Sequence, residues 1–389
     1  RGGGFGAASG VSNPYARGLT CANPCCSVGL TCATTVAPQK GVTFKEAPGM
    51  REVMCGKKWK KAAWCIFFFL GLAVGILFLV LYLLFADEPD YNLQFVNATA
   101  VSDAGGRPDV FVDAKQLHEW MNSDRGVTLL DARDDTNVFI SAVRQKRVIS
   151  GSVAARWTSF AANGGILKSV PTLQTLFASR GVSNDVPVVV FGGWEAQWGE
   201  EGRVFWSLKY LGHKDVHILY GGIWGWLDSG LDVPARFSGP PAVPGDFVVE
   251  EKPELRYTSD EILQLLTNGA PGSLVIIDAR AEFEYNGATP YGSDRGGHII
   301  EAETYHWKNV FDKDGNIRPA TDLQMEFAAL GVTREGTEAI ATYCTKGVRS
   351  GFMWSVLWYL GYGPSLGNYD GSWYHWARNS SLPIDTGSN

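Results

Sequence analysis

One cysteine stands apart from the other six in this chain, in a short polar loop. Cys344 follows the apolar run Ala339–Tyr343, and Lys346, Gly347 and Arg349 lie within five residues of it. A thiol reacts as its thiolate, and neighbouring positive charge lowers the pKa of a cysteine below its usual value of roughly 8.5. These residue types and this spacing therefore predict a nucleophilic cysteine.

The place of this loop in the predicted structure also favours an anion. Residues 339–343 are typical of a strand, and an apolar helical pattern begins within a few residues of Gly347. Free N–H groups and the positive end of a helix stabilise negative charge, and glycine permits the positive φ that a curled loop needs. A buried structural cysteine is the alternative. It explains the thiol but not the two cations and the glycine around it.

Two stretches of the chain resemble each other at a separation of about 149 residues. The run TLLDAR at 128–133 is echoed by VIIDAR at 275–280, and FWSLKYLG at 205–212 is echoed by MWSVLWYLG at 353–361. In each copy a later strand leads through a loop into a helix that ends at Leu-Gly, a common stop signal. Alternating strands and helices predict an α/β fold in which helices cover a parallel sheet.

The pattern divides the chain into five parts. We expect a Gly/Ala/Cys-containing extension, a single transmembrane helix, a first α/β domain, a Pro-rich linker and a second, Cys-bearing α/β domain. Their respective ranges are 1–56, 62–86, 107–238, 239–256 and 257–389.

The transmembrane helix is predicted from an uncharged apolar run at 62–86, longer than the about 20 residues that cross a bilayer. Lysines precede the run and acidic residues follow it, so the positive-inside rule puts the N-terminus on the matrix, stromal or cytoplasmic side. The chain starts with Arg1, which suggests a removed presequence. We therefore expect a lipid-bilayer anchor, favour the mitochondrial inner membrane, and keep a thylakoid or other plastid membrane as the alternative.

The extension contains a cluster of cysteines whose role the sequence leaves open. Metal binding, disulfides and acylation are all compatible with it, although the absence of C-x2-C pairs and of a nearby histidine weakens a zinc site. Ordering of this segment against other subunits of a membrane complex is the favoured interpretation. The net charge of −6 argues against a nucleic-acid partner. The cluster consists of Cys21, Cys25, Cys26 and Cys32.

Residues 107–389 resemble the rhodanese superfamily, specifically the tandem-domain thiosulfate and 3-mercaptopyruvate sulfurtransferases. The similarity rests on an active loop that opens with cysteine and on Asp-Ala-Arg at 278–280. The resemblance implies that Cys344 is catalytic and that other loop residues and Arg280 bind a small anionic sulfur donor. The loop residues with this implied role are Lys346, Gly347, Val348 and Arg349.

Two features depart from this family. The GGHIIEAE segment at 296–303 has Ile300 and Glu301 where the family has Pro and Gly. The first repeat has no cysteine between Gly192 and Arg203, and its glutamates would repel an anionic donor. As in the family, this copy is expected to be an inert scaffold.

The activity implied by the resemblance is transfer of a sulfane sulfur from thiosulfate or 3-mercaptopyruvate to a thiophilic acceptor, through a persulfide on Cys344. No metal or organic cofactor is required. The alternative is an accessory or structural subunit of an organellar membrane complex that keeps the fold with little or no activity. A phosphatase is a further hypothesis. It is weaker because only four residues separate Cys344 from Arg349, one fewer than a phosphate-binding loop uses.

Overall fold

The computed structural model describes residues 67–77, 92–133, 148–231, 243–270, 272–363 and 365–387. The predicted N-terminal extension and its cysteines lie outside these residues. Within the predicted membrane span, residues 67–77 are helical, and the rest of the span also lies outside the described residues. None of the helices in the described ranges is long and apolar enough to cross a membrane. The membrane anchor therefore stays a prediction.

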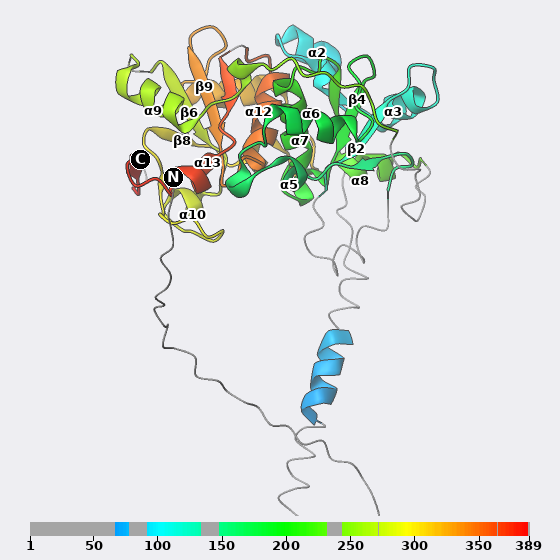
Figure 1. Ribbon diagram of the computed structural model, residues 1–389, viewed down its shortest axis with the longest axis horizontal. Helices are drawn as coiled ribbons and strands as arrows, with labels where there is room; N and C mark the ends of the chain where they lie inside the picture. Colours follow the sequence, from blue (N-terminus) through cyan, green and yellow to red (C-terminus); the bar gives the residue numbers. More distant parts are fainter. Residues whose placement is uncertain are drawn as a thin grey trace, which may run out of the picture. The chain divides into compact units, whose positions relative to one another are not determined.

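The first domain is built on a five-stranded parallel sheet with the order β1-β5-β4-β2-β3, of which Figure 1 labels β4 and β2. The central strands β2, β4 and β5 consist mainly of buried Val, Leu and Ile, as expected for strands covered on both faces. The strands are β1 (Phe111–Val112), β2 (Thr128–Asp131), β3 (Val153–Ala154), β4 (Val188–Phe191) and β5 (Val216–Leu219). The helices are α2 (Ala98–Asp103), α3 (Ala114–Met121), α5 (Trp157–Phe160), α6 (Val170–Ala178), α7 (Glu200–Tyr210) and α8 (Gly222–Asp228), with short 3-10 turns η1 (Pro108–Val110), η2 (Asn163–Gly165) and η3 (Trp194–Ala196).

The second domain repeats this architecture with a four-stranded parallel sheet, ordered β10-β9-β6-β8, and a separate antiparallel pair of β11 and β7. Its strands are β6 (Leu274–Asp278), β7 (His298–Ile299), β8 (Ala302–Thr304), β9 (Ala339–Tyr343), β10 (Leu366–Asn368) and β11 (Ile384–Asp385). Its helices are α9 (Ser259–Asn268), α10 (Glu282–Tyr285), α11 (Ala320–Ala329), α12 (Arg349–Tyr359) and α13 (Ser372–Trp376), with 3-10 turns η4 (Pro253–Leu255) and η5 (Trp307–Val310). The prediction of two α/β domains with parallel sheets is confirmed.

The strand registers align the carboxyl ends of neighbouring strands. Asp131 of β2 pairs with Phe191 of β4, and Asp278 of β6 pairs with Tyr343 of β9. The loops that follow these strands therefore leave the same edge of each sheet, where open parallel sheets bind ligands.

Local signals in the sequence set the ends of several helices. Thr258 and Glu261 form a capping box at the start of α9, which satisfies two N–H groups that lack helical partners. Helices α7 and α12 both stop at the predicted Leu-Gly, where Gly212 and Gly361 have φ of 87° and 92°. Glycine adopts this left-handed conformation without the steric cost that other residues incur.

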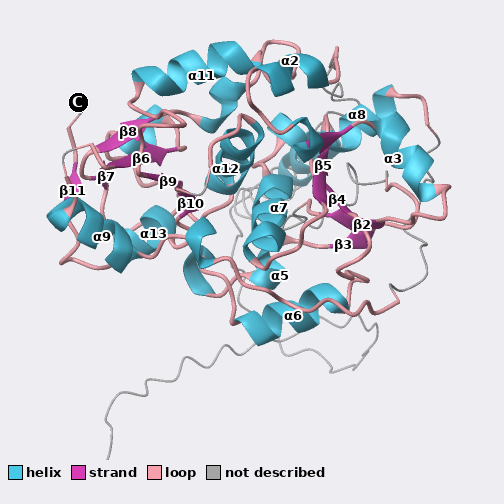
Figure 2. Ribbon diagram, turned by 90° about the horizontal axis from the view of Figure 1, so that it is seen from above, coloured by secondary structure: helices cyan, strands magenta, loops and turns pink. Residues whose placement is uncertain are grey.

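Helices α7 and α12 lie side by side between the two sheets (Figure 2). Their close approach depends on glycine. A Cβ at Gly202 would lie 2.3 Å from the Cα of Phe352, and a Cβ at Gly351 would lie 2.8 Å from the Cα of Arg203. One hydrophobic core includes side chains from both domains. Burying Phe352 alone contributes roughly 1.5–3 kcal/mol to the stability of this shared core.

Residues 243–256, within the predicted Pro-rich linker, follow the surface of the first domain. Glu250 and Lys252 donate backbone hydrogen bonds to Leu211 and Tyr210 at the end of α7, at 3.1 and 2.7 Å. Phe247 is buried. The described part of the linker is therefore attached to the first domain rather than free in solution.

Candidate active site

Cys344 directly follows strand β9 and lies at the start of the loop that leads into α12. This residue is only 1% exposed, and its thiol is not part of a disulfide. The backbone of Cys344 is fixed on both sides, because its N–H donates to Ser372 Oγ at 3.1 Å and its carbonyl accepts the N–H of Trp373 at 2.9 Å. Ser372 has a φ of 53°, a conformation uncommon for residues other than glycine. Helix α13 thus anchors the cysteine from the far side of the loop.

The surroundings of the Cys344 sulfur favour its anion. Burial by itself would raise the pKa of this thiol. The charge of Arg349 and hydrogen bonds from the backbone N–H groups of Ser350 and Lys346, together with the Ser350 hydroxyl, outweigh the burial. The pKa of Cys344 is consequently lowered from its ordinary value, as a nucleophilic thiolate requires.

Arg349 is the first residue of α12 and is held by a buried carboxylate. Its Nη1 lies 2.6 Å from Glu284 Oε2, and its Nη2 donates to Glu284 Oε1 at 3.0 Å and to Thr345 Oγ1 at 2.6 Å. Burial would raise the pKa of Glu284, but the hydrogen bond and charge of Arg349 and the Thr345 hydroxyl hold it below its usual value. The Arg349 charge is therefore fixed near the sulfur and already paired.

The aromatic rings of Trp198 and Tyr291 also lie near the Arg349 guanidinium. Both ring centroids are 5.6 Å from its Cζ, and the two rings contact each other edge to face at 5.7 Å. Trp198 comes from the first domain and Tyr291 from the second. Both rings are exposed at the surface. Residues of both domains thus border the active loop.

Lys346 is part of the loop, and its side chain points toward Tyr374. Its Nζ lies 4.8 Å from the centroid of the Tyr374 ring. Together with Trp157 and Lys168 of the first domain it borders a pocket of about 570 Å³. Cys344 is not among the residues that line this pocket.

Gly347 and Val348 complete the loop. Gly347 has a φ of 78°, so the predicted need for a positive φ at this position is met by the structure. Val348 is buried and caps the start of α12. Both residues shape the backbone around the sulfur.

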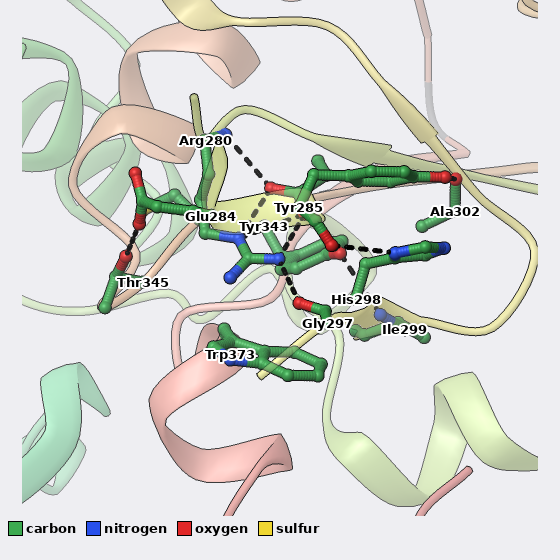
Figure 3. A network of polar contacts seen from close by, with 12 residues as sticks. Arg280, Glu284, Tyr285, Gly297, His298, Ile299, Ala302, Tyr343, Thr345 and Trp373 are labelled. Atoms are coloured by element: carbon green, nitrogen blue, oxygen red, sulfur yellow. Dashed lines mark hydrogen bonds and ion pairs between the residues drawn. The ribbon is translucent and has the colours of Figure 1, made fainter. Parts of the chain in front are cut away.

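Arg280 is buried within the second domain (Figure 3). Its Nη2 donates to Asp278 Oδ2 at 2.6 Å and to the Gly297 carbonyl at 2.7 Å, and its Nε contacts both oxygens of Asp278. The guanidinium also lies over the ring of Trp373, with Cζ 4.8 Å from the centroid. These contacts join the ends of several elements, so they favour a structural role over direct contact with a donor.

The GHIIEA turn has local hydrogen bonds and one unusual backbone conformation. His298 Nδ1 lies 3.1 Å from the Tyr285 carbonyl, and its ring stacks on that tyrosine (Figure 3). Glu301, at the position where the resemblance implies glycine, has a φ of 63°. This residue therefore adopts the left-handed conformation without being a glycine.

The first domain has no cysteine at the equivalent strand end. Gly192 takes that place, because the Ile223 N–H donates to its carbonyl at 3.0 Å just as the Trp373 N–H donates to that of Cys344. A Cβ at Gly192 would lie 1.9 Å from Glu201 Oε2, so a carboxyl group fills the space of the missing nucleophile.

The Glu201 carboxyl is fully buried, and neither of its oxygens makes a well-formed hydrogen bond to another described residue. Burial, followed by the charge of Glu200, raises its pKa to about 8, and the backbone amides of Glu201 and Trp194 only partly oppose this. The first domain thus holds a largely neutral acid at neutral pH, at the strand end that is equivalent to the position of Cys344 in the second domain.

Several residues around the sulfur were not identified from the sequence. Glu284 stands four residues after Arg280, but nothing in the sequence pairs it with Arg349. Ser372 lies 28 residues after Cys344, and nothing in the sequence connects its hydroxyl to the Cys344 backbone. Arg203 reaches the loop from the first domain, which was expected to be an inert scaffold. No group of three or more His, Cys, Asp or Glu side chains suited to a metal ion occurs in the described part of the chain.

Comparisons with known proteins agree with this architecture. A family model for the rhodanese-like domain matches residues 113–229 and 258–379. The chain is 28% identical to a putative thiosulfate sulfurtransferase of Haloferax volcanii over 306 residues, which cover 74% of this chain and all of that protein. It is 34% identical to the sulfur carrier protein TtuD of Thermus thermophilus over 221 residues, or 54% of this chain and 75% of that protein.

Solved structures share the fold at lower sequence identity. The wild-type structure of EanB matches with a TM-score of 0.63 and 20% identity, covering 73% of this chain and 70% of that one. An anaerobic ergothioneine biosynthesis enzyme from Chlorobium limicola matches with a TM-score of 0.63 and 20% identity, covering 72% and 71%. At this identity the likeness concerns the arrangement of the two domains.

Proposed function

Because the chain belongs to the rhodanese-like family, we propose that it moves a sulfane sulfur from an anionic donor to a thiophilic acceptor through a persulfide on Cys344. One observation carries the proposal. The Cys344 sulfur, at the end of a central strand, faces backbone N–H groups of Lys346 and Ser350 and the charge of Arg349. The same groups that stabilise a thiolate would stabilise the persulfide anion that replaces it.

The reaction has two displacements. The Cys344 thiolate attacks the outer sulfur of thiosulfate, the S–S bond of the donor breaks, and sulfite leaves with the bonding electron pair. With 3-mercaptopyruvate the C–S bond breaks instead, and the enolate of pyruvate takes the proton of the donor thiol. An acceptor such as cyanide then attacks the outer persulfide sulfur, which regenerates the thiolate and releases thiocyanate.

The loop residues have distinct roles in this proposal. The Lys346 ammonium attracts the anionic donor toward the loop by its charge, and the backbone amides of the loop stabilise the sulfur that is transferred. Gly347 and Val348 hold those amides in place, while Arg349 contributes charge. The predicted donor contact of Arg280 is not included, because its guanidinium is bound to Asp278 and Gly297.

The direct test is mass spectrometry of the full chain after treatment with thiosulfate. We expect an added sulfur atom on Cys344 that cyanide removes, with thiocyanate as product, and no adduct in Cys344→Ser. A sulfur-free Cys344 after prolonged exposure to both donors would refute the proposal. Parallel assays with thiosulfate and 3-mercaptopyruvate identify the preferred donor.

An accessory subunit is the second candidate, and it is favoured by the burial of Cys344, which is 1% exposed. In that case the domains would serve as a scaffold in a membrane complex. Native purification distinguishes the two, because an accessory subunit co-purifies stoichiometrically with other chains and has negligible thiosulfate:cyanide turnover within that assembly.

The proposal includes a membrane anchor over residues 62–86, with the domains on the side opposite the N-terminus. It is supported by the uncharged run and its flanking charges, and by the exposed apolar side chains of the helical residues 67–77. The mitochondrial inner membrane is our first proposal and a plastid membrane the second. Resistance to alkaline extraction, followed by protease protection in isolated organelles, tests both the anchor and its orientation.

A further inference from the structure

A buried arginine of the first domain reaches the active loop of the second. Arg203 lies on α7 and is 1% exposed. Its Nη1 donates to the Gly347 carbonyl at 3.1 Å, and its Nη2 donates to the Gly165 carbonyl at 2.5 Å. One guanidinium therefore connects a turn of the first domain to the loop that contains Cys344.

The conformation of Gly347 fits this contact closely. With a φ of 78°, this residue is in the left-handed region, and a Cβ on it would lie 2.3 Å from Arg203 Nη1 and 2.7 Å from the Asp370 carbonyl oxygen. The arginine holds the Gly347 carbonyl outside the loop. Since the carbonyl dipole would repel a sulfur anion, this orientation leaves the N–H groups of Lys346 and Ser350 to face the sulfur.

A second contact of the first domain supports the same loop. Gly165 has a φ of 100°, and a Cβ there would lie 2.3 Å from the Lys346 carbonyl oxygen. The neighbouring Gly164 packs against the Tyr374 ring, which a Cβ would approach to 2.7 Å. The 164–165 turn and Arg203 together enclose the outer side of the loop.

The Arg203 charge is balanced by neighbours from the second domain. Its Nη2 lies 3.7 Å from Asp370 Oδ2, and the other oxygen of that carboxylate contacts Arg256 Nε at 3.1 Å. Burial lowers the pKa of Arg203 to about 10, with Asp370 and the Cys344 thiolate opposing the shift. The guanidinium is therefore charged at neutral pH.

Another arginine shows what a purely structural bridge between the domains looks like. Arg107 of the first domain donates from Nη1 to the carbonyls of Trp358 and Tyr362, at 2.6 and 3.0 Å, at the C-terminal end of α12. It joins the same two domains but contacts no residue of the 344–349 loop in these bonds. The acceptor of Arg203, in contrast, is the loop itself.

We infer that Arg203 is a positioning residue for the sulfur-transfer reaction, which holds the Gly347 carbonyl outward so that the loop amides converge on the Cys344 sulfur. This inference rests on the proposed function. It gives the domain without a nucleophile a specific part in the chemistry of the other.

The test compares Arg203→Met and Arg203→Lys with the matched control Arg107→Met in the full chain. The primary measurement is the pH dependence of Cys344 alkylation by iodoacetamide, which reports the thiolate pKa without any turnover. We expect Arg203→Met to move that pKa toward the ordinary value of roughly 8.5 and to lower kcat by roughly 10²-fold, the size of effect that small displacements of catalytic groups have. Arg203→Lys should fall between Met and wild type.

The control separates positioning from stability. Arg107→Met should lower Tm while the thiolate pKa and kcat stay at wild-type values. If Arg203→Met fails to fold, the thiolate pKa is measured at reduced temperature in Arg203→Lys, which is the smaller change. A wild-type thiolate pKa in a folded Arg203 variant would overturn the inference. If the wild-type chain forms no persulfide but the Arg203 variants still shift the thiolate pKa, the proposed function fails and the positioning role stands.

Discussion

Two equivalent positions, Cys344 and Gly192, show how the two domains differ at the end of the equivalent strand. In the second domain a thiol faces backbone N–H groups and an arginine charge. In the first, the Glu201 carboxyl reaches back into the space beside Gly192 and is surrounded by other acidic groups. The thiol consequently tends to lose its proton and the carboxyl tends to keep it.

The Glu201 carboxyl makes stability depend on pH. Its pKa is raised from 4.5 to about 8 in the folded protein, so its contribution to stability is fully present below pH 4.5 and is lost as pH rises through about 8. Glu201→Gln stays neutral, and we expect it to be more stable than wild type at pH 9 by about 1–3 kcal/mol, with little difference at pH 5. Urea unfolding at both pH values measures this. Glu282→Gln, at an exposed carboxylate, is the control, and equal changes in the two variants would contradict the assignment.

Glu301 has a left-handed backbone conformation, with a φ of 63°, that is strained for a residue other than glycine. A left-handed φ costs a non-glycine residue roughly 1–2 kcal/mol, and the larger unfolded-state entropy of glycine offsets about 0.5–1 kcal/mol of any relief. We therefore expect Glu301→Gly to raise the free energy of unfolding by up to about 1 kcal/mol. Glu303→Gly, in strand β8, should lower it. Chemical denaturation of both variants distinguishes strain relief from a general glycine effect.

At the level of elements, α7 and α12 determine the geometry of the site. Both helices start directly after the loops at the strand ends, and both supply N–H groups there. Their glycines let the helices approach closely enough for Arg203 to reach Gly347. Spacing between these two helices therefore affects the position of the loop as well as the stability of the core.

Gly202→Ala tests this spacing. In a helix alanine is more favourable than glycine by about 1 kcal/mol. At this position, however, its Cβ would lie 2.3 Å from the Cα of Phe352, and relieving that clash would require the backbone to move. We expect a net destabilisation of about 1–3 kcal/mol and slower alkylation of Cys344. Gly363→Ala, which has open space around its Cβ, should leave both quantities unchanged. A stabilised Gly202→Ala would show that the helices separate freely.

Local patterns predicted much of this arrangement and long-range contacts were missed. The Cys344 loop, the parallel strands and the Leu-Gly helix ends could be predicted because each depends on residues close in sequence. The Glu284 partner of Arg349 could not, since it is 65 residues away in the sequence and meets the arginine only through the packing of elements. The contact of Arg203 with the loop could not be predicted for the same reason, because its acceptor Gly347 lies in the other repeat.

At the level of the whole molecule, the two domains behave as one structure. Arg107 and Arg203 bridge them, and the indole N–H of Trp194 donates to the Gly315 carbonyl at 2.7 Å. The shared hydrophobic core contains buried side chains of both. Removal of either domain would expose buried side chains of this shared core.

We expect a single cooperative unfolding transition for residues 92–387. Calorimetric and van't Hoff enthalpies should agree, because the shared interface disfavours an intermediate in which only one domain is folded. Near-ultraviolet circular dichroism and Cys344 alkylation should follow the same denaturant midpoint. Two resolved transitions would show that the domains unfold independently.

The burial of Cys344 has a kinetic consequence. A residue that is 1% exposed meets a reagent only during a brief opening of the protein around it. When that opening is slower than the attack that follows, chemically unlike reagents consume the thiol at one common ceiling rate. At that ceiling, differences in the intrinsic reactivity of sulfur compounds no longer appear in the rate at which they consume the thiol.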